Sequence, residues 1–271
     1  MVEGSNPSSP DKINNYTINM STFLISSPLE QFEIVTILPL TLLGLNISLT
    51  NSSLFLGISL FICIFWLVLS FYKVTLIPSN WQLAQETFYS LTSNIVKDNL
   101  GSKGEIYFPF ILTLHSLLLF CNLVGMVPYS FTVTSHIIFT FTLALSIFIG
   151  INIIGVRTHG FKFFSLFLPK GVPLIIMPLL VTIEIVSYII KVFTLSIRLF
   201  ANMTSGHTLL KIIAGFSWTM LKAGGLLAFF HIIPLALLLI LIGLELGIAA
   251  LQAYVFTLLT CIYLNDVLDM H

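Results

Sequence analysis

Three long apolar runs without a single charged side chain constrain this sequence more than any other feature. They are Leu54 to Tyr72, Phe108 to Val127 and Ile137 to Val156. A helix needs about 20 apolar residues to cross the roughly 30 Å hydrocarbon layer of a membrane. Each run meets that length, so the sequence predicts three membrane-spanning helices here.

Two later apolar stretches are about twice as long as a bilayer requires. Leu174 to Ile213 runs for 40 residues and Leu226 to Leu264 for 39 residues. As continuous helices, each would be about 60 Å long. We therefore expect a steeply tilted antiparallel pair, or a break in each helix, with Pro178, Gly206 and Pro234 as candidate bends.

A shorter amphipathic helix is predicted between the first two spans. It follows Pro78, with Ser79 as its N-cap. Its apolar residues recur at three- and four-residue spacing and form a narrow face: Trp81, Ala84, Phe88, Leu91 and Ile95. Such a face is typical of a helix that lies in the membrane interface. The fold class predicted is therefore an all-α polytopic membrane protein with about five transmembrane helices plus one interfacial helix.

The composition supports this class and excludes several others. Hydrophobic residues make up 57% of the chain and charged residues 8%, whereas soluble domains carry about 25% charged residues. Eleven basic and eleven acidic residues cancel, so no nucleic-acid partner is expected. The three cysteines lie inside apolar runs without paired spacing, so we expect no disulfide, no metal site and no cofactor.

Residues 1–52 are rich in Asn, Ser, Thr and Pro. We interpret them as a polar N-terminal arm that is partly a removable leader, and residues 53–271 as the membrane domain. Basic residues near helix ends indicate orientation, because they accumulate on the inner side. Those on the side opposite the arm are Lys73, Lys97, Lys103, Arg157, Lys162 and Lys170, against Lys12, Lys211 and Lys222 on the arm side. The N-terminus is therefore predicted outside and the C-terminus inside.

Among the apolar segments, only the two longest contain Asp, Glu, Lys or Arg, and each such residue costs at least about 2.5–3.5 kcal/mol at a helix centre. In the first segment Glu184, Lys191 and Arg198 repeat every seven residues, on a stripe with Tyr188 and Asn202. None of these charges has an opposite charge three or four residues away. Arg198 must therefore find a carboxylate elsewhere.

The second long segment carries a similar polar stripe. Glu245 and Gln252 are seven residues apart, and His231 lies fourteen residues before Glu245. The roughly opposite face carries the small residues Gly243, Gly247 and Ala250, which permit close helix packing. We therefore expect this helix to have one face that packs closely against another helix without water, and one polar face.

Antiparallel pairing of the two segments brings particular residues level with each other. One register places Arg198 near Gln252 and His207 near Glu245, within about 3 Å along the axis. Arg198 and His207 are nine residues apart, however, and point in nearly opposite directions on a straight helix. Either a distortion near Gly206 reduces this angle, or the two side chains serve different compartments.

Purely structural interpretations stand beside these functional ones. Glu184 and Lys191 could anchor the inner interface with their charged ends in water. His231, like other helix histidines, could simply form a hydrogen bond, and His207 with Glu245 could be a static salt bridge. Arg198 could likewise belong to a buried structural ion pair.

The string Ser196-Ile-Arg-Leu-Phe-Ala-Asn-Met-Thr-Ser-Gly-His207 resembles subunit a of the F-type ATP synthase, called ATPase subunit 6 in mitochondria. The resemblance covers about residues 28–270 and also rests on residues 122–129, 245–254 and 263–266. It implies five spanning helices and an interfacial one, with the last two as a steep hairpin against a ring of c subunits. Other membrane and peripheral-stalk stator subunits and the lipid bilayer are the further partners implied.

The same resemblance implies that Arg198 is the essential arginine that separates two proton half-channels. Bacterial members usually carry Glu and His at the positions of His207 and Glu245, so this chain has the exchanged, mitochondrial-like arrangement. It implies a location in the mitochondrial inner membrane, with the N-terminus in the intermembrane space and the C-terminus in the matrix. The residues expected along the proton path are Asn202, His207, Glu245, Gln252, Glu184, Lys191, His231 and Tyr254.

Two other classes of membrane protein are alternatives. A haem-bearing subunit of a respiratory chain requires paired histidines on facing helices, and the six histidines here form no obvious pairs. A stand-alone transporter typically has internal repeats with broken helices in corresponding halves. The sequence contains no such repeat.

Overall fold

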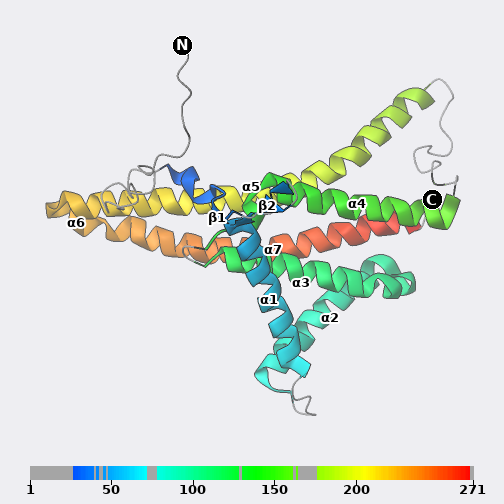
Figure 1. Ribbon diagram of the computed structural model, residues 1–271, viewed down its shortest axis with the longest axis horizontal. Coiled ribbons are helices and arrows are strands. Elements are labelled where there is room, and N and C mark those ends of the chain that lie inside the picture. Colours follow the sequence, from blue (N-terminus) through cyan, green and yellow to red (C-terminus); the bar gives the residue numbers. More distant parts are fainter. Residues whose placement is uncertain are drawn as a thin grey trace.

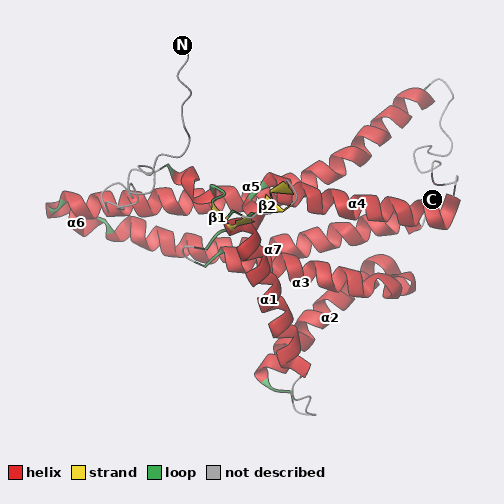
Figure 2. Ribbon diagram, in the orientation of Figure 1, coloured by secondary structure: helices red, strands yellow, loops and turns green. Residues whose placement is uncertain are grey.

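The computed structural model describes residues 27–39, 41–42, 45–46, 48–71, 78–127, 130–160, 163 and 176–268. Within these residues, five helical segments are long and apolar enough to cross a membrane. Figure 2 shows that helices account for nearly all of the regular structure. The predicted class, an all-α polytopic membrane protein, is confirmed. The predicted leader lies outside the described residues, and the boundary at residue 52 stays a prediction.

Helices α1 (Asn51–Phe71), α3 (Phe108–Gly125) and α4 (Ile137–His159) correspond to the three charge-free runs. A proline in the first turn of α3 leaves no helical hydrogen bond unmade, because that N–H has no partner within a helix. Helix α4 ends at Gly160, whose positive φ of 58° suits glycine at a helix C-terminus.

Helix α2 (Asn80–Leu100) forms where the amphipathic helix was predicted, and the short helix η3 (Gly101–Tyr107) joins it to α3. The Ser79 side chain accepts a hydrogen bond from the Gln82 N–H at 3.4 Å, so the predicted cap is present. Within the chain, the buried residues of α2 gather mainly toward its C-terminal half, where Ile95 is buried, whereas Trp81 is 65% exposed. The position of α2 in the membrane interface stays a prediction.

The two longest apolar stretches form α5 (Met177–Ala223) and α7 (Ile232–Leu268), with the short helix α6 (Gly225–Phe230) between them. Pro178 and Pro234 lie in the first turns of these helices, and α5 is helical through Gly206. Helix α5 is therefore unbroken at Pro178 and Gly206, whereas the second stretch is interrupted at His231, three residues before Pro234, where α6 ends and α7 begins. Figure 1 shows α5 changing direction near its middle and its later half running beside α7.

Length supports a strong tilt of both helices. Helix α5 has 47 residues and α7 has 37, which correspond to about 70 Å and 55 Å at 1.5 Å per residue. Both exceed the roughly 30 Å of hydrocarbon in a bilayer. The orientation of this pair relative to a membrane stays a prediction.

The segment before α1 lies against α5. It contains the short helix η2 (Pro28–Phe32), and the strands β1 (Thr36–Leu38), β2 (Thr41–Leu42), β3 (Leu45–Asn46) and β4 (Leu49–Thr50). Strand β1 pairs with β4 and β2 with β3, both antiparallel. The ammonium of Lys211 in α5 donates to the Ser27 carbonyl at 3.3 Å.

The buried core lies where α3, α4, α5 and α7 meet. Hydrogen bonds between side chains and neighbouring helices add to apolar packing there. The Asn122 amide of α3, fully buried, donates to the Ala249 carbonyl of α7 at 3.1 Å. The hydroxyls of Thr140 in α4 and Ser196 in α5 are 3.2 Å apart. These contacts fix the helices that carry the polar residues of the hairpin.

The contact between α4 and α7 depends on Gly155. A Cβ added at this residue would lie 2.5 Å from Cγ1 of Val267, which is fully buried. Gly155→Ala should therefore lower stability by about 1–3 kcal/mol through overpacking, seen as a lower temperature of thermal unfolding of the purified protein. Gly150→Ala in the same helix is the matched control, because nothing lies within 4 Å of its added Cβ. Equal unfolding temperatures for the two variants would contradict this packing.

Candidate functional site

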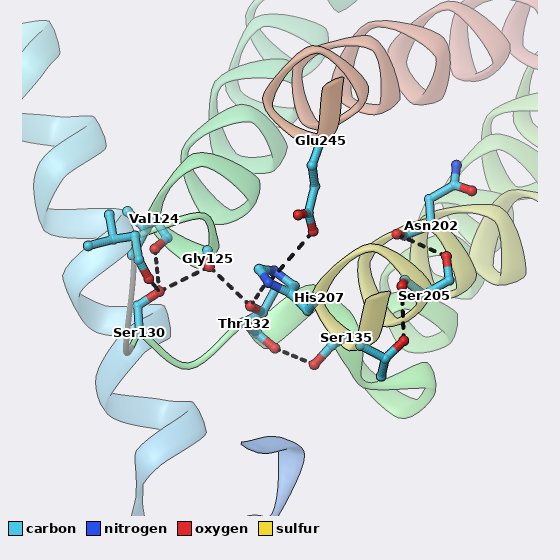
Figure 3. Close-up of polar contacts among 11 residues, drawn as sticks. Val124, Gly125, Ser130, Thr132, Ser135, Asn202, Ser205, His207 and Glu245 are labelled. Atoms are coloured by element: carbon cyan, nitrogen blue, oxygen red, sulfur yellow. Dashed lines mark hydrogen bonds and ion pairs between the residues drawn. The ribbon is translucent and has the colours of Figure 1, made fainter. Parts of the chain in front are cut away.

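The centre of the candidate site is a histidine and a glutamate on facing helices. Nδ1 of His207 in α5 lies 3.6 Å from Oε1 of Glu245 in α7 (Figure 3). The two residues are therefore neighbours, as the antiparallel register predicts. Glu245 is only 4% exposed, and neither of its carboxyl oxygens has a hydrogen-bond partner among the described residues. A buried carboxyl group faces an imidazole inside the hairpin.

Gly206 makes room for this carboxyl group. A Cβ added at Gly206 would lie 2.5 Å from Oε1 of Glu245, closer than non-bonded atoms approach. The sequence marks this glycine as a candidate bend, but α5 is continuous there. Its contribution is the missing side chain, which lets Glu245 approach the backbone of α5.

The other edge of the His207 ring contacts the segment between α3 and α4. Nε2 of His207 lies 3.0 Å from the Thr132 hydroxyl oxygen (Figure 3). Thr132 directly precedes the short helix η4 (Val133–Ser135), whose residues are all buried. Thr204 of α5 holds η4 by donating its hydroxyl proton to the Ser135 carbonyl at 3.2 Å.

Sequence reasoning missed Thr132. Hydroxyl residues without charge stand out little in an apolar sequence. The cluster of Ser and Thr between residues 130 and 135, next to a predicted span end, was the available signal.

A cavity of about 280 Å³ lies beside the pair, between α5 and α7. Asn202, Ser205, Gly206 and Glu245 contribute to its lining, and apolar side chains supply the rest. Asn202, a residue predicted for the proton path, therefore lies at the same cavity as Glu245. The cavity gives space for water next to a buried titratable group.

Arg198 lies on the exposed face of α5. Among the residues that the structure describes, no carboxylate forms an ion pair with it. No hydrogen bond joins it to the half-buried Gln252, although the register places the two near each other. The cause is the nine-residue spacing from His207 on an unbroken helix, which turns Arg198 away from the side that His207 occupies.

A second polar cluster lies farther along the same helix pair. Nζ of Lys191 is 3.3 Å from Oδ2 of Asp266 and 5.0 Å from the ring centre of Tyr263. The hydroxyl of Tyr188 donates to Oδ1 of Asn152 in α4 at 2.8 Å. Lys191 therefore has a carboxylate partner on α7. Sequence reasoning missed Asp266 as a site residue, because it looked for charge partners three or four residues away.

The remaining predicted residues lie apart from the His207–Glu245 pair. Glu184 is half-buried and has no ion pair within the described part of the chain. Nδ1 of His231 forms a hydrogen bond with the Ala228 carbonyl three residues earlier, which agrees with the purely structural interpretation of this histidine. Tyr254 is 40% exposed on α7.

The small-residue face of α7 has no helix packed on it within the described residues. A Cβ added at Gly243 or Gly247 would meet nothing within 4 Å. Both glycines and Ala250 are exposed. The face therefore remains open to another chain.

The two polar clusters occupy opposite ends of the α4–α5 contact. His207 contacts the connection at the start of α4. At the other end of α4, Nε2 of His159 lies 3.2 Å from the carbonyl oxygen of Leu268, which is two residues beyond Asp266 in α7. Arg198 lies between the clusters, seven residues from Lys191 and nine from His207. These spacings correspond to about 10 Å and 14 Å along the helix.

Known proteins resemble this chain over almost its whole length. Residues 52–265 match the family described as ATP synthase A chain. An ATP synthase subunit a from Chondrus crispus is 78% identical over 249 residues, which cover 92% of this chain and 98% of the relative. Those from Marchantia polymorpha and Pylaiella littoralis are 47% and 49% identical, covering 90% and 92% of this chain and 99% and 100% of the relatives.

The family match covers the five candidate spans except Asn51 and residues 266–268, and it includes the His207–Glu245 pair and Arg198. The identities extend through nearly the whole of each relative. The chain belongs to the ATP synthase A chain family.

Proposed function

We propose that this protein is the proton-translocating stator subunit of a rotary ATP synthase, and that it forms two offset half-channels against a ring of c subunits. Other membrane and peripheral-stalk subunits of the stator, and the lipid bilayer, complete its surroundings. It works in the mitochondrial inner membrane, with its N-terminus in the intermembrane space and its C-terminus in the matrix. The exchanged His207 and Glu245 support the mitochondrial location.

One observation carries the proposal: an exposed arginine lies along α5 between two polar clusters. The cluster of His207, Glu245 and Asn202 belongs to the outer half-channel. The cluster of Lys191 and Asp266 belongs to the inner half-channel, together with Glu184, which lies seven residues before Lys191 in α5. Because Arg198 has no carboxylate partner in the described part of the chain, its charge is available to a carboxylate of another subunit.

The chemistry follows from the cost of charge in lipid. A rotor carboxyl group that faces lipid stays neutral, because desolvation disfavours its charged form, whereas a nearby guanidinium favours ionisation. A rotor site therefore loses its proton on approaching Arg198 and regains one after passing it. Arg198 itself keeps its proton at any working pH. It separates the half-channels and relays no proton.

The open small-residue face of α7 suits this arrangement. Glycines at a helix surface let another helix approach closely, and Gly243 and Gly247 have free space around them. A rotor helix on this side brings its carboxyl group near the exposed face of the hairpin. Each proton that crosses 100 mV releases about 2.3 kcal/mol, which drives rotation.

His207 and Glu245 connect the outer water to the rotor site. Imidazole and carboxyl groups exchange protons readily, and Glu245, which faces His207, lines a cavity large enough for water. Among the residues that the structure describes, the carboxyl group of Glu245 has no hydrogen bond that would have to break before transfer. The pair thus acts as a relay at the inner end of the outer path.

Arg198→Ala should abolish coupled ATP synthesis, with a loss of about 10²-fold or more. Protons should then leak without rotation, because no fixed cation separates the half-channels. Arg198→Lys should restore only part of the coupling, because a desolvated ammonium can lose its proton and lacks the planar donor fork. Proton flux and ATP synthesis are measured together in vesicles with assembled complexes.

Lys222→Ala is the matched control for Arg198, because this cation lies in the last turn of the same helix, where its Nζ is 5.5 Å from the ring centre of Trp218. It should leave coupling intact. Coupled synthesis at the normal rate in Arg198→Ala would mean that Arg198 is only a structural cation.

Glu245→Gln should slow proton-driven ATP synthesis by at least about tenfold, since an amide cannot carry the proton. ATP hydrolysis by the detached catalytic head should be unchanged, because the variant lies far from nucleotide chemistry. Synthesis is followed in vesicles over a range of pH. Normal synthesis by this variant at every pH would remove Glu245 from the proton path.

Gly206→Ala should slow synthesis as well, because its methyl group displaces the Glu245 carboxyl group from His207. The matched control is Gly215→Ala, two turns or more along the same helix, where an added Cβ meets nothing within 4 Å. The initial rate of synthesis per assembled complex distinguishes the two variants. Equal rates in both would show that the close approach of Glu245 to α5 does not matter.

A further inference from the structure

We propose that Thr132 is a positioning residue for His207: it holds the imidazole with one proton on Nε2, so that Nδ1 is the nitrogen that exchanges protons with Glu245. This inference rests on the proposed function of the His207–Glu245 pair. It adds a residue outside the hairpin to the site, and it assigns the proton of the neutral His207 ring to Nε2.

The geometry brings three groups into one line of contacts. The Thr132 hydroxyl oxygen lies 3.0 Å from Nε2 of His207 and 3.2 Å from the Gly125 carbonyl oxygen. On the opposite edge of the ring, Nδ1 faces Oε1 of Glu245 at 3.6 Å. Figure 3 shows His207 between Thr132 and Glu245. Thr132 is only 4% exposed, so water competes little for its hydroxyl group.

A threonine hydroxyl group has one proton to donate, and it can accept from another donor at the same time. The Gly125 carbonyl lies in the last turn of α3, where carbonyls have no donor within the helix. Ser130 also approaches this carbonyl, at 3.0 Å, but its single proton is nearer to the carbonyls of Val124 and Val127, at 2.7 Å each. If Thr132 donated to Nε2 of His207, the Gly125 carbonyl would be left without a donor, so we assign the Thr132 proton to Gly125.

The position of the Thr132 proton decides which nitrogen of His207 carries a proton. Because the Thr132 proton is used for Gly125, the hydroxyl oxygen accepts from Nε2–H of His207. A neutral imidazole with its proton on Nε2 has a free lone pair on Nδ1. That lone pair faces the Glu245 carboxyl group, as proton transfer between the two requires.

The transfer step is balanced with these groups alone. The O–H bond of a protonated Glu245 breaks as the Nδ1–H bond of His207 forms, which gives a carboxylate and an imidazolium. The Nε2–H bond stays intact throughout and keeps its hydrogen bond to Thr132, so the proton gained on Nδ1 leaves again from Nδ1, to the Glu245 carboxylate or to a water molecule beside the pair. In the opposite tautomer Nδ1 would already carry a proton, and the ring could accept none from Glu245.

Local structure holds Thr132 in this position. The Thr204 hydroxyl of α5 bonds the Ser135 carbonyl, which ties η4 to the helix that carries His207. Gly125 leaves space for the threonine, because a Cβ there would lie 2.7 Å from Cγ2 and 3.0 Å from Oγ1 of Thr132. The hydroxyl group is thus fixed relative to both the carbonyl and the ring.

Valine and serine variants separate the hydroxyl group of Thr132 from its methyl group. Thr132→Val keeps the shape and removes the hydroxyl, and it should lower proton-driven ATP synthesis per assembled complex about tenfold, which corresponds to about 1.4 kcal/mol. Thr132→Ser keeps the hydroxyl and should retain most of the synthesis. A packing role for the side chain would give the reverse order, because valine fills the same space.

Thr134→Val is the matched control. Thr134 lies in the same buried segment, but its hydroxyl oxygen has no hydrogen-bond partner among the described residues. Synthesis should be close to normal in this variant. A loss equal to that in Thr132→Val would overturn the inference, because it would show that any change in this segment disturbs the complex.

A second comparison tests whether Thr132 acts through His207. Thr132→Val should cause little further loss in a His207→Ala background, because interacting residues are not additive. If Thr132→Val does not assemble, Thr132→Ala and Thr132→Ser replace it, and the inference requires faster synthesis with serine than with alanine. Equal rates for these two would overturn it.

The outcomes also distinguish this inference from the proposed function. If His207→Ala slows synthesis and Thr132→Val does not, the positioning role is wrong and the proton path stands. If His207→Ala synthesises ATP at the normal rate, the pair is not on the path, and the inference fails with it.

Discussion

A carboxyl group buried inside an apolar helix pair is the constraint on which the rest of this structure depends. An unpaired charge in such a place costs several kcal/mol, and Glu245 is only 4% exposed. The surroundings meet that constraint with three features: the absent side chain at Gly206, the facing ring of His207 and a neighbouring cavity. The connection from α3 to α4 then supports His207 through Thr132.

The fold could largely be predicted from the lengths of apolar runs, because the thickness of a membrane converts length directly into spans. The continuity of the long helices could not be predicted this way. A proline interrupts a helix interior but is accepted in a first turn, so Pro178 and Pro234 mark helix starts. The packing of α2 on α3 and α7 could not be predicted either, because the spacing of its apolar residues does not identify the helices that they contact.

The site was predictable where one helix pair supplies it. The antiparallel register alone brings His207 to Glu245, and the nine-residue spacing accounts for the outward direction of Arg198. Thr132 was beyond reach for a different reason, because it contacts α5 from the segment before α4 and this pairing depends on tertiary packing that no local spacing encodes. Asp266 lies on α7, but its ion pair with Lys191 crosses between the two helices, whereas the spacing argument looked for charge partners within one helix.

Side-specific labelling of single cysteines tests the central claim, that Arg198 separates two water-filled paths. The native thiols Cys63, Cys121 and Cys261 are buried and would first be replaced. Single cysteines at Ser205 and Asp266 would then be exposed to a membrane-impermeant thiol reagent from one side at a time. The account predicts labelling of the Ser205 position only from the outer side and of the Asp266 position only from the inner side. Labelling of either position from both sides would contradict it.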